Sequence, residues 1–403
     1  MSPHPPRRPV SDWATDFDHL SQEWAERSPE ITAELRERCP VAHTDRFHGA
    51  YLVTRYDDAV AVAHDAATFS NRVTAVNENH PDRIRLEAPP ITLDPPAHGP
   101  VRRSLLPPFS PRAVARLEPF VVQSCDRALD ALAGRELVDG AHDYAQIVPV
   151  EVTARLLGLP AEDGDRFRAW VKGILADGLV DLELAARCTR EVRAYFADQL
   201  ARRRVEPADD LVTWVATTRV DDDSGAPPRP LTEREQLGAL YLLLVAGIDT
   251  TWSAIGASLH HLATHPEDRH RLVVEPALME RAVEELLRFF SPVNMARVIE
   301  ADAEIGGCPV RAGERLLIGF ASANRDAAHF DRADEVVLDR RENRHVAFGV
   351  GVHRCLGSNL ARMELRVALT RWLARYPDFE PAGPVRWTIG VRGPSTVPLR
   401  LLR

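Results

Sequence analysis

The residues with the most obvious chemistry stand in one run, Phe348-Gly349-Val350-Gly351-Val352-His353-Arg354-Cys355-Leu356-Gly357. A cysteine thiolate is a strong metal ligand. Glycine has no β-carbon and tolerates φ > 0, so Gly349, Gly351 and Gly357 would let a flat ligand come close to the backbone. A helical pattern over residues 358–376 starts just after the cysteine. Its unpaired N–H groups and positive dipole end would favour a thiolate at Cys355.

Three interpretations of this run compete. A lone cysteine is most often a small buried hydrophobe. A zinc site made of His345, His353 and Cys355 is a second possibility, but the sequence has no CxxC pair and no fourth ligand at a usual spacing. A haem with Cys355 as its axial ligand accounts for the glycines as well, and thiolate ligation promotes O–O cleavage at haem iron.

The pattern Phe-Gly-x-Gly-x-His-x-Cys-x-Gly resembles the haem-binding signature of the cytochrome P450 monooxygenases. This resemblance implies a mainly α, triangular-prism fold with a small β-rich lobe. It also implies haem b, held between a long helix and the cysteine loop. The haem contacts expected in this loop are Phe348, Gly349, His353, Cys355 and Gly357.

A long helix is predicted from a capping box, Thr232-Glu233-Arg234-Glu235, to about residue 264. At 1.5 Å per residue it would span roughly 48 Å. Its apolar stretch, residues 237–248, should be buried at the centre of the molecule. The helix would then cross the whole molecule.

The middle of this helix, Ala246-Gly247-Ile248-Asp249-Thr250-Thr251, contains poor helix formers. The Thr250 hydroxyl can bond to the Ala246 carbonyl and so open and bend the helix. One interpretation is a satisfied core hydroxyl beside a buried ion pair of Asp249. The stretch also resembles the oxygen-activation motif of the family, which implies proton delivery by Asp249 and Thr250 and a haem contact at Ala246.

Two cations stand one helical turn apart in the helix predicted to begin near residue 98. His98 and Arg102 share a face at spacing i, i+4 and could pair with one anionic group. In isolation a solvated basic face would be the better interpretation. Beside a haem loop we expect them to hold a propionate. By resemblance, Arg297 is a further propionate-binding arginine.

Glu285 and Arg288 stand at i, i+3 in a predicted helix over residues 280–290. Most such pairs lie on the surface and contribute little. In the family this Glu-x-x-Arg pair is buried and joined by another arginine. Arg340 matches that position best and Arg341 is the alternative. The resemblance implies a structural role for the trio, holding the cysteine loop.

The walls of the substrate pocket are expected from the long helix, from loops at residues 71–91 and 291–298, and from a C-terminal tip near residues 389–390. The candidates are Val76, Asn77, Leu242, Val245, Ala246, Val293, Met295 and Ile389. Polar residues in the first loop hint at a substrate with a polar or anionic end, or are simply solvated. They are Asn77, Asn79, His80, Arg83 and Arg85.

Other elements follow from local patterns. We expect a strand at residues 50–54, then a helix at 56–64, and a long irregular loop at 69–96. Further helices are predicted at residues 112–133, 145–157, 163–175 and 181–203, with a short helical piece at 21–27. A hairpin turn at residues 305–309 should lead to a strand at 315–318.

Composition sets broad limits. The chain has 403 residues, 45% of them hydrophobic and 27% charged, which suits a soluble globular protein. Its net charge of −9 argues against nucleic-acid binding. Five scattered cysteines suggest a reducing compartment. No signal peptide or membrane span is evident, so we expect a cytoplasmic monomer. We divide it into a flexible lead-in, residues 1–30, and one domain, residues 31–403.

The implied reaction inserts one oxygen atom of O₂ into a small organic substrate. No flavin or iron–sulfur motif is present. Electrons are therefore expected from a ferredoxin and its reductase. An acidic partner could dock at five arginines near the cysteine loop: Arg102, Arg103, Arg354, Arg362 and Arg366.

Three other functions are weaker candidates. A haem-based sensor or carrier would not need Asp249 and Thr250. A peroxide-driven enzyme of the same fold often lacks that pair too. A zinc-stabilised helical binding protein would use Cys355 without haem.

Overall fold

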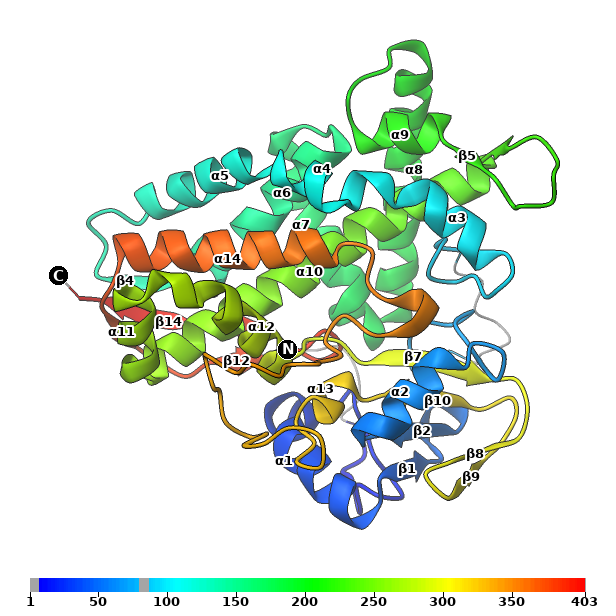
Figure 1. Cartoon of the computed structure of the whole chain (residues 1–403), viewed down its shortest axis with the longest axis horizontal. Helices are drawn as coiled ribbons and strands as arrows, with labels where there is room; N and C mark the ends of the chain where they lie inside the picture. Colours follow the sequence, from blue (N-terminus) through cyan, green and yellow to red (C-terminus); the bar gives the residue numbers. More distant parts are fainter. Residues whose placement is uncertain (1–6, 80–86, 403) are drawn as a thin grey trace.

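A single helix, α10 (Glu233–Thr264), crosses the molecule, and the other helices pack around it (Figure 1). The computed structural model describes residues 7–79 and 87–402. The predicted capping box is confirmed, since the Glu235 N–H donates to Thr232 Oγ1 at 3.2 Å and the Thr232 N–H donates to Glu235 Oε2 at 2.7 Å. By length and composition α10 could cross a membrane, but 67% of its most apolar window is buried inside the protein, which indicates a core helix.

Most of the helices that surround or extend α10 match the predicted positions to within a few residues, whereas the helices at residues 211–217 and 266–274 were not predicted. The helices around α10 are α3 (His98–Leu105), α4 (Pro111–Ala115), α5 (Glu118–Asp130), α6 (Ile147–Leu157), α7 (Gly164–Leu175), α8 (Leu182–Val205), α9 (Leu211–Thr217), α11 (Pro266–Val274), α12 (Met279–Phe290) and α14 (Ser358–Arg375). The helix predicted at residues 112–133 is divided into α4 and α5. Pro119 explains the break, because proline suits the first turn of a new helix and not a helix interior.

A mixed sheet forms a separate lobe with strand order β1-β2-β10-β7-β3 (Figure 1). Its strands are β1 (Val41–Thr44), β2 (Ala50–Val53), β10 (Arg315–Ile318), β7 (Met295–Ile299) and β3 (Phe69–Ser70). β2 pairs in parallel with β10, and the other pairs are antiparallel. Three short helices accompany the sheet, α1 (Gln22–Arg38), α2 (Tyr56–His64) and α13 (Phe320–Ala323).

A smaller sheet, β11-β14-β4, closes the opposite end of the molecule. The remaining strands belong to it or to two-stranded ribbons: β4 (Leu137–Asp139), β5 (Arg219–Val220), β6 (Arg229–Pro230), β8 (Ala303–Ile305), β9 (Cys308–Val310), β11 (Phe379–Pro381), β12 (Arg386–Trp387), β13 (Pro394–Thr396) and β14 (Pro398–Leu401). The predicted hairpin turn is confirmed between β8 and β9, where Gly306 and Gly307 have φ of 55° and 83°.

The N-terminal region differs from the prediction of a flexible lead-in. The part of residues 1–30 that the structure describes is packed onto the sheet lobe, with Phe17 and Leu20 buried. Arg46 also contacts Asp18 there, at 3.0 Å. The short helical piece predicted at residues 21–27 is the start of α1, which continues to Arg38. Of the polar loop residues, His80, Arg83 and Arg85 lie outside the described residues.

Candidate active site

A large cavity lies between α10 and the loop that precedes α14. It encloses about 1630 Å³ between protein atoms, including its opening to solvent. Most of the predicted site residues line it: His98, Arg102, Leu242, Ala246, Thr250, Val293, Met295, Arg297, Phe348, Gly349, His353, Cys355 and Gly357. Residues far apart in the sequence are thus brought together as predicted.

The cysteine loop turns sharply before α14. The Cys355 N–H donates to the Phe348 carbonyl at 2.8 Å, and Gly349 and Gly351 have φ of 65° and 71°. Gly357 differs from the prediction, because its φ is −87°. A β-carbon at Gly357 would meet no atom within 4 Å, since it would point into open space. This glycine therefore leaves room in the cavity rather than allowing an unusual turn.

The Cys355 side chain lines the cavity and is exposed to it. Burial raises the pKa of its thiol, while the Gly357 N–H and the guanidinium of Arg102 lower it. The start of α14 therefore stabilises the thiolate as expected, but burial raises the pKa of Cys355 by more than this contact lowers it. A coordinated metal cation would deprotonate the thiol outright.

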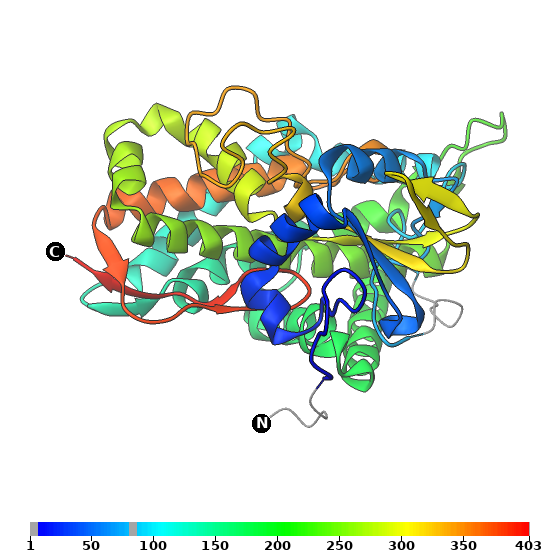
Figure 2. The same cartoon turned by 90° about the horizontal axis from the view of Figure 1, so that it is seen from below.

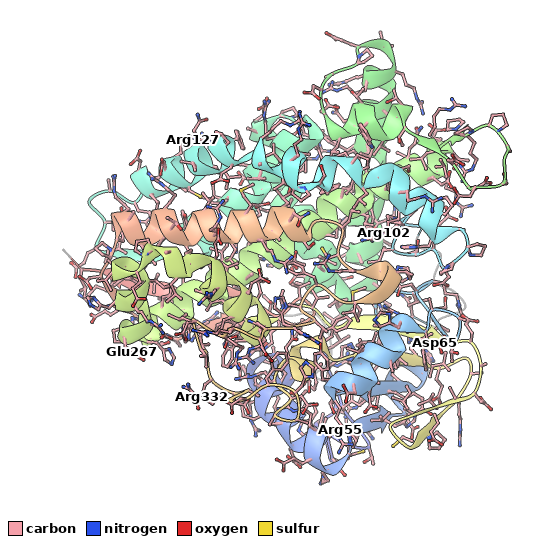
Figure 3. The ribbon with its side chains drawn as sticks, viewed as in Figure 1. Arg55, Asp65, Arg102, Arg127, Glu267 and Arg332 are labelled. Atoms are coloured by element: carbon pink, nitrogen blue, oxygen red, sulfur yellow. The ribbon has the colours of Figure 1, made fainter. Side chains whose placement is uncertain are left out.

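Four basic side chains form a cradle on one side of the cavity: His98, Arg102, Arg297 and His353. The rings of His98 and His353 lie 4.4 Å apart. Arg102 on α3 lies beside the cysteine loop (Figure 3), and its Nη2 donates to the Arg354 carbonyl at 2.5 Å. Nε2 of His98 and Nε2 of His353 are buried without hydrogen-bond partners among the described residues. The cradle therefore has donors free for an anionic ligand.

Protonation in the cradle differs from the predicted pair of cations. Burial, followed by the charges of His353 and Arg102, lowers the pKa of His98 to about 4, so this histidine is neutral near pH 7. Burial lowers the pKa of Arg297 to about 10, which leaves it charged. The charge available to an anion thus comes mainly from the two arginines.

Asp94 is a site residue that the sequence did not reveal. Its carboxylate accepts hydrogen bonds from Ser70 Oγ at 2.5 Å and the Asn71 N–H at 2.9 Å. Its Oδ1 lies 3.8 Å from His353 Nε2. Asp94 precedes His98 by one helical turn, and this spacing was the only signal for it. It places a negative charge behind the cradle.

The middle of α10 supplies the polar groups on the opposite wall. Thr250 Oγ1 donates to the Ala246 carbonyl at 3.0 Å, as predicted, although α10 stays continuous. Asp249 is buried and is not among the residues that line the cavity. Burial raises the pKa of Asp249 to about 8, while a bond with the Trp252 side chain lowers it in part. No ion pair of Asp249 with a described residue is present, so the ion-pair interpretation fails.

The predicted trio joins Glu285 and Arg288 on α12 to Arg340 in the segment before the cysteine loop. Arg288 Nε and Nη2 each donate to the Glu285 carboxylate at 2.8 Å, and both residues are fully buried. Arg340, rather than Arg341, completes the trio, with its Nε 3.0 Å from Glu285 Oε2. Arg288 also donates to the carbonyls of Asn324 and Ala333 at 2.7 Å. These bonds fix the segment that leads to the cysteine loop.

Glu364 on α14 is a second residue that the sequence did not reveal. It is fully buried and lines the cavity, and both of its carboxyl oxygens have no partner in the described part of the chain. Burial raises its pKa to about 8. In the sequence, Glu364 lies nine residues after Cys355 and looks like an ordinary polar residue of an amphipathic helix.

Four predicted pocket residues lie away from the cavity lining. Val76 and Asn77 pack toward the N-terminal region, where His19 Nε2 lies 2.9 Å from the Val76 carbonyl and Arg315 Nη2 donates to the Asn77 carbonyl at 2.8 Å. Val245 faces the hydrophobic core. Ile389 precedes Gly390, which lines a different cavity.

The donor set fits haem better than zinc. Three features suit a flat macrocycle with anionic edges. They are the Cys355 thiol on the cavity wall, the free space at Gly357 and the basic cradle, whose histidine nitrogens lack hydrogen-bond partners among the described residues. His345 instead lies 3.0 Å from Glu284. Within residues 7–79 and 87–402 no three His, Cys, Asp or Glu side chains form a metal-binding group.

Comparison with known proteins decides the family. The family model for cytochrome P450 matches residues 182–383. A mycinamicin IV hydroxylase/epoxidase from Micromonospora griseorubida is 35% identical over 378 residues, covering 91% of this chain and 94% of that protein. The chain belongs to the cytochrome P450 family. A vitamin D(3) 25-hydroxylase from Pseudonocardia autotrophica is also 35% identical to this P450, with 94% of each chain covered.

Solved structures agree with this assignment. The bacillaene polyketide synthase P450 PksS of Bacillus subtilis has a TM-score of 0.86 at 29% identity, covering 96% of this chain and 100% of that one. The fold is therefore the predicted P450 fold, mainly helical with a small β-rich lobe. This P450 is a haem-thiolate monooxygenase that activates O₂ and oxidises a small organic substrate with electrons from separate redox partners.

Proposed function

We propose that this chain is a single domain, which includes the packed residues 7–30 as well as residues 31–403, and that it binds haem b through Cys355 and oxidises a largely apolar organic substrate. The observation that carries this proposal is the position of Cys355 and Thr250 on the same cavity, one from the loop before α14 and the other from α10. When bound, haem supplies the iron at which O₂ is activated.

Arg102 and Arg297 would carry the charge that pairs with the haem propionates, and the neutral imidazoles of His98 and His353 would act as hydrogen-bond donors. Phe348 would pack against the macrocycle, since it lines the cavity and Arg362 stacks on its outer face, 4.5 Å from the ring centroid. The trio of Glu285, Arg288 and Arg340 would hold the loop without contacting the reacting atoms.

Asp249 and Thr250 would deliver protons to the oxygen site. A carboxyl with a pKa of about 8 keeps its proton near pH 7, as a proton donor should. The Thr250 hydroxyl lines the cavity, and it would pass a proton inward by turning its O–H away from the Ala246 carbonyl. Because Asp249 does not line the cavity, it would act through Thr250 or through water.

The substrate wall is largely apolar. Leu242, Ala246, Val293 and Met295 line the cavity with Ile91 and Pro90, which favours burial of an apolar substrate. Relatives are named for mycinamicin IV and vitamin D(3). We infer an apolar organic molecule of similar kind, with its site of oxidation set by these side chains.

We propose further that a ferredoxin and its reductase supply the electrons, and that the protein is a cytoplasmic monomer. Exposed Arg354 supports an acidic partner, since no described residue forms an ion pair with it. The large exposed hydrophobic residues are scattered over separate elements and form no obvious subunit contact. Sedimentation of the purified holoprotein tests the monomer.

The first test is the absorption spectrum of the reduced protein with carbon monoxide. Thiolate ligation predicts a strongly red-shifted Soret band, and Cys355→His should bind haem without that shift. An unshifted band in the wild-type protein would remove Cys355 as the ligand. In turnover, Thr250→Ala should divert electrons from product to peroxide, while Thr250→Ser should retain coupling because it keeps the hydroxyl.

A further inference from the structure

A second cavity lies beside the first, between α1, the end of α12 and the C-terminal hairpin of β12 and β13. Its free interior is small, with room for about two or three water molecules once the open mouth is left out. Figure 2 shows α1 in blue next to the red C-terminal hairpin, whose turn residues Thr388, Gly390 and Arg392 line the cavity. Pro292 lines both cavities. The second cavity is therefore separated from the haem cavity by a single residue in the chain.

Arg392 is the first of two guanidinium groups that line this cavity. Its backbone N–H donates to the Pro292 carbonyl at 2.7 Å, and its Nε donates to the Ala25 carbonyl at 3.2 Å. Its guanidinium stacks 4.1 Å from the Trp387 ring centroid. In the described chain it has no carboxylate partner. Burial, and next the charge of Arg325, lowers the pKa of Arg392 to about 10.

Arg325 is the second guanidinium, and it follows α13 from another part of the chain. It stacks 4.0 Å from the Phe289 ring centroid. Its Nε lies 3.0 Å from Asp334 Oδ1, but Asp334 is largely exposed and the Nε lacks hydrogen-bond geometry. Burial lowers the pKa of Arg325 as well. Two partly buried cations thus line one cavity. Removing their charges from water costs free energy, and a bound anion would offset that cost.

The remaining lining contains donors and lacks acids. Asn294 has a buried side-chain oxygen without a partner, so its amide can turn its NH₂ group toward a ligand. Ser28, Thr32, Ser322 and Thr388 also line the space. The hydroxyls of the last three already donate to the carbonyls of Ser28, Thr54 and Val391, so only Ser28 adds a hydroxyl donor. No aspartate or glutamate among the described residues lines it. The lining itself therefore carries two positive charges and no negative one, although the carboxylates of Asp334 and Glu30 lie near the two arginines.

We propose that the second cavity is an anion site, in which Arg392 and Arg325 bind a carboxylate or phosphate group. The two guanidinium groups supply charge-assisted hydrogen bonds, and the amide of Asn294 supplies a further donor. The anion is either a free small ion or the charged end of an organic molecule whose apolar part passes Pro292 toward the haem cavity. This inference does not depend on turnover of the enzyme.

Thermal unfolding of the holoprotein tests the site. Sodium phosphate is titrated against sodium chloride at equal ionic strength. Binding to the folded state should raise the Tm in a saturable way, by about 2 °C at phosphate ten times above its Kd. Arg392→Gln should abolish the response, and Arg392→Lys should retain part of it. Arg386→Gln, which changes an exposed arginine of the same hairpin, should leave it intact.

Each result has a defined meaning. A wild-type protein that responds equally to both salts would overturn the proposal, as would an equal phosphate response in Arg392→Gln. Each variant is compared with itself, so a general loss of stability does not obscure the result. Arg325→Gln provides a second variant from another element and should also lose the response.

A series of carboxylic acids distinguishes the two sources of the anion. If acetate stabilises the protein and dodecanoate leaves the Soret band unchanged, the ligand is a free small anion. If dodecanoate shifts the Soret band of the wild-type protein and not that of Arg392→Gln, the site holds the charged end of a substrate. Lack of stabilisation by any acid or by phosphate would contradict both.

Discussion

At the scale of single residues, the haem cavity depends on a glycine that the backbone does not require. Gly357 has ordinary φ, and its missing β-carbon faces open space. Gly357→Ala should therefore leave the apoprotein as stable as the wild type but weaken haem binding about tenfold, since overpacking costs roughly 1–3 kcal/mol. Haem titration and unfolding of the apoprotein measure the two effects separately.

Gly351→Ala is the matched control in the same loop. Gly351 has φ of 71°, and an added β-carbon would lie 2.7 Å from the Ala63 carbonyl oxygen. This variant should lose stability by about 1–3 kcal/mol even without haem. Equal effects of both substitutions on the apoprotein would contradict the role assigned to Gly357.

Glu364 makes stability depend on pH. Its pKa is raised from 4.5 to about 8 by burial, so the folded protein keeps a proton that the unfolded chain releases within that range. Stability should be fully present below about pH 4.5 and fall as the pH rises toward 8. Glu364→Gln cannot ionise and should be more stable than the wild type at pH 8, by roughly 3 kcal/mol.

Urea unfolding of both proteins at pH 5 and pH 8 checks this sign. The difference in the free energy of unfolding between Glu364→Gln and the wild type should increase from pH 5 to pH 8. A difference that stays constant, or that decreases at pH 8, would mean that Glu364 is already ionised or paired in the folded protein.

Residue types and spacing predicted many of the groups that line the cavity, because those groups carry their own chemical signature. Cys355, Thr250 and Arg297 all line the cavity. Asp94 and Glu364 escaped prediction, since an acid on a helix or loop is ordinary until its surroundings are known. The neutrality of His98 also depends on burial, which the sequence does not state.

At the scale of elements, the trio on α12 couples a helix to the approach of the cysteine loop. Arg340→Gln removes one partner of the buried Glu285 carboxylate. We expect a loss of about 3 kcal/mol in the free energy of unfolding, together with weaker haem retention. Denaturant unfolding and haem transfer to an acceptor protein measure these losses.

Arg341→Gln is the adjacent control. Arg341 is exposed, and surface substitutions usually change stability by less than about 0.5 kcal/mol. Similar losses in the two variants would mean that charge in this segment matters, and not the contact with Glu285.

Elements with strong local signals were predicted closely, such as α10 from its capping box and α2 from its apolar spacing. Strand pairing was not, because β2 and β10 are more than 260 residues apart in the chain. The helical piece predicted at residues 21–27 was too short, since α1 continues through Pro29 to Arg38.

At the scale of the whole molecule, ion pairs within the protein reduce the number of free arginines on the predicted docking surface. Arg362 binds Glu284 at 2.6 Å, Arg366 binds Glu118 at 2.8 Å and Arg103 binds Asp223 at 2.5 Å. These pairs leave Arg354 as the most available charge of the five. Arg354→Glu should slow reduction by an acidic ferredoxin about tenfold at low ionic strength.

Stopped-flow reduction over a range of salt concentrations measures this effect, which should shrink as salt screens the charges. Arg332→Glu changes an exposed arginine remote from the cysteine loop (Figure 3) and should reduce normally. An unchanged rate in Arg354→Glu would remove this surface as the docking site.

Strand pairing in the two main sheets also constrains when the protein can finish folding. β10 must pair with β2, and β14 must pair with β4, so each sheet joins an early part of the chain to a late one. During synthesis on the ribosome β2 can pair with β1 at once, but its other edge and β4 lack their partners until the later strands emerge. Closure of the haem cavity, and with it cofactor insertion, is thus a step that follows translation.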